Sequence, residues 1–165
     1  TACPHCFHTI SNEYPDFGGS YNVVHHSEFI QKLLDEGKLN PEKTMDGNIT
    51  YHDACYLGRH NDVYDEPRSV INSVLSEDAI YVELEQSKSS SFCCGAGGGN
   101  MWHEDDRGDR VNVTRMEQII DSGADKVATA CSFCVIMMDD AMKVKGKENE
   151  MKVQDIAEII AERLW

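Results

Sequence analysis

Thiols are the side chains of this sequence best suited to chemistry, because five of its seven cysteines fall into one pattern. Two of the five are adjacent, one precedes that pair with 37 residues between, and the last two form a C-x-x-C after it. These five are Cys55, Cys93, Cys94, Cys131 and Cys134. Neighbouring cysteines rarely bond to each other, because a disulfide between them strains the peptide. The adjacent pair is therefore typical of two different partners or of one metal assembly.

The number and grouping of these thiols indicate which metal they suit. One zinc ion takes four ligands, usually from two knuckles of the C-x-x-C kind. This pattern has one knuckle, one adjacent pair and one single cysteine, which is too many for one zinc. An iron–sulfur cluster fits better, because several irons offer positions to soft thiolates. Gly95 opens a glycine run that continues at positions 97, 98 and 99, where the backbone could approach such a core and point N–H groups at its sulfurs.

Composition limits the kind of protein this is. The chain has 165 residues, of which 41% are hydrophobic, enough for one ordinary domain or for one domain and part of another. A net charge of −14 argues against binding nucleic acid or an anionic membrane surface, and favours a protein partner with a basic patch. No apolar run of about 18 residues and no signal peptide is present, so we expect no membrane contact from this segment itself.

The cysteine count also bears on the cellular compartment. Seven is an odd number and the spacing is clustered, which favours metal ligation in a reducing compartment over a secreted disulfide framework. We therefore expect a cytoplasmic location. Because the first residue is Thr1 rather than Met, we also expect further chain upstream, through which the protein would reach the cytoplasmic face of a membrane.

An internal repeat predicts how the chain is organised. The sequence Thr-Ala-Cys-x-x-Cys occurs at residues 1–6 and again at 129–134. Each copy is followed by an apolar stretch and then by residues with one apolar helical face, at 21–24 and 27–36 after the first copy and at 151–153 and 155–164 after the second. We interpret residues 1–46 as the C-terminal part of a first module and residues 47–165 as a complete second module.

The second module is predicted to be an α/β domain. Strands are expected at 49–55, 79–84 and 125–130, and helices at 67–75, 110–122 and 131–142. This alternation implies crossover connections and a mainly parallel sheet with flanking helices. Cysteines follow the predicted strands, and ligands of such sheets gather at the carboxyl ends of the strands, so we expect the five thiols at one edge of the sheet.

Other motifs carry weaker signals. The Gly-x-Gly start of the glycine run lacks the third glycine of a dinucleotide loop, because Asn100 stands there. Among seven histidines, only His52 is placed to matter, either through hydrogen bonding at a strand end or, as the less favoured alternative, through contact with a cluster sulfur. Arg59 and Arg115 would either offset the charge of an anionic cluster or form ordinary surface ion pairs.

The residues around this pattern resemble a known family. Tyr-His-Asp-Ala-Cys-Tyr-Leu-Gly-Arg at 51–59, the Cys-Cys-Gly at 93–95, Arg115-x-Glu117 and the final C-x-x-C are similar to the cysteine-rich CCG domain. That domain occurs in the B subunit of heterodisulfide reductase and in iron–sulfur subunits of glycolate, lactate and glycerol-3-phosphate oxidation. The wording of this chain looks most like the end of membrane-linked iron–sulfur proteins thought to pass electrons from electron-transfer flavoprotein to quinone. The full motif spans residues 51–138.

The resemblance implies a cofactor and a set of ligands. The cofactor would be a 4Fe-4S cluster, with the noncubane form described for heterodisulfide reductase left open, held by the five cysteines of the pattern. Cys3 and Cys6 would close an incomplete first site whose other cysteines lie upstream. Gly95, His52 and Arg59 would lie next to the cluster. No residue is assigned as catalytic.

The function implied is that of an electron-transfer domain in an iron–sulfur oxidoreductase subunit. It would relay electrons between a redox partner, such as a flavoprotein or dehydrogenase, and an acceptor such as quinone, together with other subunits of the complex. The segment alone would not be a complete enzyme. Two alternatives remain open: thiol–disulfide reduction at the cluster, as in heterodisulfide reductase, and a non-redox module that binds zinc and serves a structural or docking role.

Overall fold

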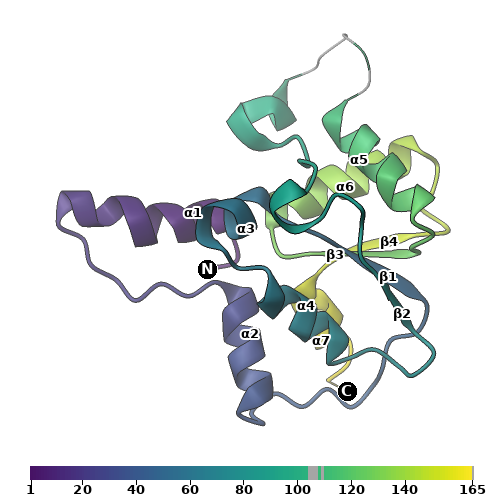
Figure 1. The fold of residues 1–165 in the computed structure, drawn as a ribbon, viewed down its shortest axis with the longest axis horizontal. Coiled ribbons are helices and arrows are strands. Elements are labelled where there is room, and N and C mark those ends of the chain that lie inside the picture. Colours follow the sequence, from purple (N-terminus) through teal and green to yellow (C-terminus); the bar gives the residue numbers. More distant parts are fainter. Residues whose placement is uncertain (104–107, 109, 165) are drawn as a thin grey trace.

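A four-stranded parallel sheet forms the centre of the protein (Figure 1). The structure, a computed structural model, describes residues 1–103, 108 and 110–164. The strands are β1 (Asn48–His52), β2 (Ile80–Val82), β3 (Lys126–Thr129) and β4 (Lys152–Asp155). Their order in the sheet is β2-β1-β3-β4, and every neighbouring pair is parallel. The predicted α/β class with a mainly parallel sheet is confirmed.

Helices connect and cover the strands. The α-helices are α1 (Pro4–His8), α2 (His26–Asp35), α3 (Cys55–Asn61), α4 (Asp65–Asn72), α5 (Val111–Asp121), α6 (Ser132–Val144) and α7 (Ile156–Ala161). A π-helical turn, η1 (Thr9–Glu13), and three short 3₁₀ segments, η2 (Tyr14–Phe17), η3 (Lys88–Ser90) and η4 (Gly97–Trp102), complete the described elements. None of the described helices is long and apolar enough to cross a bilayer.

Apolar side chains fill the space on both sides of the sheet. Figure 1 shows α5 and α6 on one side and α4 and α7 on the other. The two sides pack on strand residues such as Ile49 and Val127, which are almost fully buried. Met116 and Met138 come from the first helix pair, and Ile71 from the second, and all three are 0% exposed. β-Branched residues suit the pleated strands, and the helices bury the one apolar face that their spacing provides.

Some predicted elements differ from the observed ones. Residues 21–24 form no strand, although Val24 accepts a hydrogen bond from the N-terminal Thr1. The predicted strand 49–55 ends at His52, because Cys55 already begins α3, a helix that the pattern did not indicate. The helix predicted to start at Pro67 starts two residues earlier, at Asp65. The remaining strands and helices lie within a few residues of their predicted positions.

Candidate metal centre

The topology of the sheet determines where the thiols lie. Cys55 is the first residue of α3, shortly after β1, and Cys131 is the N-cap residue of α6, shortly after β3. β1 and β3 are neighbours, but the chain leaves them in opposite directions, from β1 to β2 and from β3 to β4. Open parallel sheets bind ligands at such a switch point, beyond the carboxyl ends of the strands. The fold therefore places both cysteines at its natural ligand site.

The structure brings together the five thiols of the sequence pattern. Their side chains form a continuous series of hydrogen-bonded neighbours in the order Cys55, Cys93, Cys94, Cys134, Cys131. The Sγ atoms of Cys94 and Cys134 are 3.4 Å apart, and both residues are buried. All the cysteines are free thiols. We call this series the five-thiol group.

Protons are shared unevenly within the five-thiol group. Hydrogen bonds with Cys55 and Cys94 lower the pKa of Cys93, and the bond with Cys93 raises the pKa of Cys55. A hydrogen bond with Cys134 lowers the pKa of Cys131 to about 7. Hydrogen bonds with Cys131 and Cys94, together with burial, raise the pKa of Cys134. Cys93 and Cys131 are therefore the readiest thiolates, and the thiolate is the form that binds metals.

Gly95 fixes the turn after the adjacent cysteines. Its φ of +82° lies in the left-handed region, which residues with a Cβ rarely adopt. A Cβ at this position would also lie 3.0 Å from Cβ of Val111. The backbone N–H of Gly95 donates a hydrogen bond to Sγ of Cys93 at 3.3 Å. The glycine thus allows a close backbone approach that stabilises a thiolate at Cys93.

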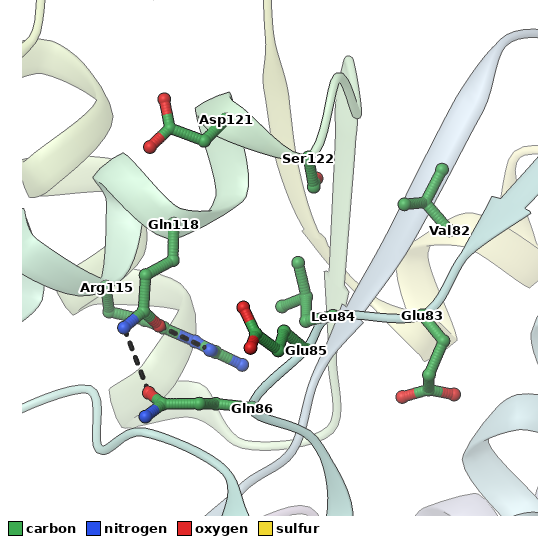
Figure 2. A pocket seen from close by; sticks show the side chains of 9 residues that line it. All are labelled: Val82, Glu83, Leu84, Glu85, Gln86, Arg115, Gln118, Asp121 and Ser122. Carbon is green, nitrogen blue, oxygen red and sulfur yellow. Dashed lines mark hydrogen bonds between the residues drawn. The ribbon is translucent and has the colours of Figure 1, made fainter.

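His52 and Arg115 lie behind the thiols. An imidazole nitrogen of His52 lies within 4.8 Å of Sγ of both Cys94 and Cys134. Burial, reinforced by Arg115, lowers the pKa of His52 to about 3, so the ring is neutral near pH 7. Nε of Arg115 donates to Nδ1 of His52 at 3.1 Å. Figure 2 shows the guanidinium beside Gln118, in a cavity between α5 and the chain that follows β2.

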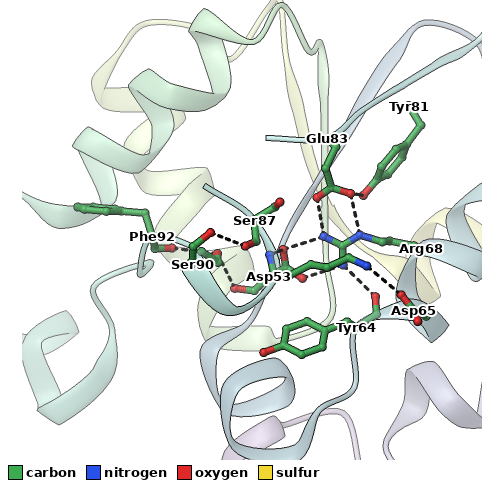
Figure 3. Close-up of polar contacts among 11 residues, drawn as sticks. Asp53, Tyr64, Asp65, Arg68, Tyr81, Glu83, Ser87, Ser90 and Phe92 are labelled. Atoms are coloured by element: carbon green, nitrogen blue, oxygen red, sulfur yellow. Dashed lines mark hydrogen bonds and ion pairs between the residues drawn. The ribbon is translucent and has the colours of Figure 1, made fainter. Parts of the chain in front are cut away.

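A buried ion network holds the loop that carries the adjacent cysteines (Figure 3). Arg68 binds both carboxylate oxygens of Asp53 at 2.8 Å each, and both oxygens of Glu83 at 2.9 and 2.6 Å. Asp53 also accepts a hydrogen bond from the backbone N–H of Lys88 at 2.7 Å. Asp53 lies two residues before Cys55, and Lys88 five residues before Cys93. One carboxylate therefore ties the end of β1 to the loop before the adjacent cysteines.

Arg59 contributes to the same loop rather than contacting the thiols. Its Nη2 donates to the carbonyl of Ser91 at 2.7 Å, two residues before Cys93. The hydroxyl of Ser91 in turn donates to the carbonyl of Asp53 at 3.4 Å. The predicted place of Arg59 beside a cluster thus becomes, in the structure, a backbone clamp on the loop that holds the adjacent cysteines.

Cys3 and Cys6 remain outside the five-thiol group. Cys3 caps α1 and Cys6 lies within that helix, exposed to solvent. The helix nevertheless approaches the five-thiol group, because the ring of His5 stacks 4.1 Å from the ring of Tyr56, the neighbour of Cys55. His5 and Tyr56 line a largely apolar cavity together with Ala54, Ala96, Phe133 and four cysteines of the group. The cavity wall therefore includes α1 but neither of its thiols.

Two polar partnerships were missed from the sequence. The Asp53–Arg68–Glu83 network joins residues that nothing in the cysteine pattern singles out. A charged residue directly after a buried strand, as Asp53 is, was the available signal. The other is the bond between His52 and Arg115, because the sequence indicated each residue separately but not their contact. Arg115 is fully buried and is not part of a surface ion pair.

Comparison with known families gives a single consistent result. The sequence profile of a cysteine-rich domain named CCG matches residues 49–139. The match covers β1 to α6 and includes all five cysteines of the group.

Curated relatives align with nearly the whole chain. It is 41% identical over 162 residues to the "Probable iron-sulfur-binding oxidoreductase FadF" of Bacillus subtilis, covering 98% of this chain and 23% of that protein. It is 42% identical over 165 residues to "EtfAB:quinone oxidoreductase" of Syntrophomonas wolfei, covering 96% of this chain and 23% of the relative. It is 34% identical over 167 residues to a subunit of the "Dihydromethanophenazine:CoB--CoM heterodisulfide reductase" of Methanosarcina acetivorans, covering 99% and 40%. The chain thus spans about a quarter of the length of the first two relatives.

Proposed function

The chain belongs to the cysteine-rich CCG domain family, and from this premise we propose that its five-thiol group holds an iron–sulfur cluster in an oxidoreductase. The observation that carries the proposal is the continuous series of five free thiols at the switch point of the sheet. The assigned ligands are Cys55, Cys93, Cys94, Cys131 and Cys134. We assign the cluster to the 4Fe-4S class, in either its cubane or its noncubane form.

The residues present suit such a group better than a single zinc ion. Zinc sites of the structural kind close with four ligands in a tetrahedron. The five-thiol group supplies five sulfurs, and a nitrogen of His52 lies within 4.8 Å of two of them. The cavity wall is formed mainly by apolar and backbone atoms, which exclude water from a redox centre. A bound iron–sulfur cluster would supply one-electron storage, at a potential set by burial, charge and hydrogen bonds to the sulfurs.

The chain's own residues would have three tasks in electron relay. The thiolates bind the metal, the N–H of Gly95 donates to Sγ of Cys93, and the Asp53 network holds the loop in place. We propose that a flavoprotein or dehydrogenase delivers the electrons and that an acceptor such as quinone receives them. The relatives named as an "EtfAB:quinone oxidoreductase" and as part of a heterodisulfide reductase support this scheme. The working complex would contain further subunits and would lie at the cytoplasmic face of a membrane.

We also propose that residues 1–46 are the end of a preceding module and residues 47–165 a complete one. Thr1 lies opposite His25, because its N donates to the carbonyl of Val24 and its carbonyl accepts from the N–H of His26. Thr129 pairs with Asp155 in β3 and β4 in the equivalent way. The hydrogen-bond register after the two Thr-Ala-Cys-x-x-Cys sequences is therefore the same, which supports a repeated unit.

Metal analysis after anaerobic reconstitution with iron and sulfide tests the cluster. We expect close to four irons and four sulfides per chain in the 4Fe-4S case, with an EPR signal that changes on reduction. Cys94→Ser and Cys134→Ser should lower the iron content, whereas Cys6→Ser, an exposed thiol outside the group, should leave it unchanged. One zinc without sulfide, persisting after reconstitution, would refute the electron-transfer proposal and leave the structural zinc alternative.

A second assay separates relay from disulfide chemistry. The reconstituted protein is given reduced electron donor and a mixed thiol disulfide, and free thiol is measured. A relay domain should release no thiol above the rate of the metal-free chain. Thiol release that is lost in Cys93→Ser would instead favour the heterodisulfide reductase-like alternative.

A further inference from the structure

Arg115 is a buried cation without a carboxylate partner among the described residues. Its side chain is 0% exposed, Nη1 donates to Oε1 of Gln118 at 2.8 Å, and Nη2 has no hydrogen-bond partner. The protein carries a net charge of −14, so carboxylates are abundant. Arg68, by contrast, binds two of them. A buried charge costs free energy unless an opposite charge compensates it. Arg115 is therefore placed to serve an anion that is not a nearby Asp or Glu.

The anionic groups near Arg115 are the thiols. One bond away, His52 lies within 4.8 Å of Sγ of Cys94 and of Cys134. Desolvation lowers the pKa of Arg115 to about 10, while Asp53 and Cys134 act in the opposite direction. The guanidinium remains charged near pH 7. Its positive charge would therefore gain a partner when the thiols become thiolates that bind metal.

The hydrogen bond between the two residues also selects one form of the imidazole. An arginine side chain has only donors. Because Nε of Arg115 donates to Nδ1 of His52, that nitrogen must be the acceptor of the neutral ring. The single ring proton is then on Nε2. His52 thereby becomes a donor on the nitrogen that is not occupied by Arg115, and it has two buried sulfurs close by.

We propose that Arg115 is a positioning residue of the metal centre: through His52 it directs an Nε2–H donor toward the sulfurs of Cys94 and Cys134, and its buried charge compensates the thiolates. This inference rests on the proposed function for its redox consequence. The tautomer of His52 is a property of the chain itself and is tested without metal.

Arg115→Met removes both the donor and the charge at nearly constant volume. Arg115→Lys retains both, and Arg115→Gln retains an amide donor without the charge. Arg163→Met is the matched control, because Arg163 is also largely buried, with a side chain 12% exposed, but lies beyond the end of α7, away from the carboxyl edge of the sheet.

The first measurement is the ring ¹⁵N spectrum of His52 in the metal-free protein. The parent, Arg115→Lys and Arg163→Met should show His52 with its proton on Nε2. Arg115→Met should show a mixture of both tautomers. An Nε2–H form that persists fully in Arg115→Met would overturn the positioning role, whatever the metal analysis gives.

The second measurement is the reduction equilibrium of the reconstituted chain. Loss of a nearby positive charge disfavours the more negative, reduced state, so Arg115→Met and Arg115→Gln should lower the equilibrium constant for reduction at least tenfold. For a one-electron couple this is about 59 mV. Arg115→Lys and Arg163→Met should remain within threefold of the parent.

Stability distinguishes this role from simple packing. Arg115→Met should unfold no more easily than the parent without metal, because it removes an uncompensated buried charge, yet it should lose iron to a chelator faster. Equal destabilisation of the metal-free and reconstituted forms, with an unchanged reduction equilibrium, would show that Arg115 has a structural role only. If Arg115→Met does not fold, Arg115→Gln provides the same comparison.

Discussion

Replacing Arg68 with methionine is expected to be among the most damaging single changes outside the cysteines. Arg68 donates five hydrogen bonds, two to Asp53, two to Glu83 and one to the carbonyl of Tyr64. The side chain of Asp53 is only 3% exposed, and after the change it would keep just the N–H of Lys88 as a described partner for its carboxylate. The change therefore leaves a buried charge without its counterion.

The magnitude follows from burial. Removing one partner of a buried ion pair costs about 3–5 kcal/mol, because the remaining charge is not solvated. Native domains are stable by about 5–15 kcal/mol in total, so the loss is a large fraction of the free energy of unfolding. The exposed pair of Arg110 and Asp140, with side chains 40% and 48% exposed, provides the control. Arg110→Met should cost no more than about 1 kcal/mol.

Urea unfolding followed by circular dichroism measures both variants. Asp53→Asn combined with Arg68→Met should be less destabilised than Arg68→Met alone, because the double variant has no orphaned carboxylate. Hydrogen exchange should also accelerate at the amide of Lys88, which reports on the loop before the adjacent cysteines. A loss below about 1 kcal/mol for Arg68→Met, equal to that of Arg110→Met, would refute the reasoning from burial.

Two further predictions concern protons. In the metal-free protein, iodoacetamide should alkylate Cys93 faster than Cys55 at pH 7, because hydrogen bonds lower the pKa of Cys93 and raise that of Cys55, although both are half-buried; mass spectrometry after timed quenching reads the rates, and equal rates would contradict the proton order. Burial and then His26 lower the pKa of His25 from 6.5 to about 3, so the unfolded chain binds the extra proton and stability should fall as the pH drops from 6.5 toward 3. The contribution of this residue is about 1.4 kcal/mol per pH unit, and His25→Asn, which keeps an N-cap acceptor, should reduce that slope in urea unfolding at pH 7 and pH 5; an unchanged slope would show that His25 does not cause it.

The sequence predicted the sheet and the grouping of the thiols for a clear physical reason. Apolar residues with strand or helix periodicity dominate the second module, and parallel strands leave few ways to connect them. Cysteines that follow β1 and β3 must then meet at one edge. The repeat of Thr-Ala-Cys-x-x-Cys pointed to matching tails, and the helix predicted at 27–36 is α2 (His26–Asp35).

Elements without such periodicity could not be predicted. The short helix α3 buries only Leu57 and Gly58, too few positions to mark a helical face. Residues 21–24 have strand-like side chains, but only Thr1 pairs with them, so no ladder forms. The bond between Arg115 and His52 joins residues 63 positions apart. Local pattern carries no information about such a pairing, and only the packing of α5 on β1 reveals it.

The shared register of the two tails makes the protein its own homologue. His25 and Asp155 occupy the same place at the start of α2 and α7, and each accepts a hydrogen bond from the backbone two residues on. Each is followed three residues later by a glutamate that closes the cap. An imidazole in one copy thus replaces a carboxylate in the other without altering the backbone. After a gene duplication, drift at this position would have been free to exchange residue types as long as a hydrogen-bond acceptor survived.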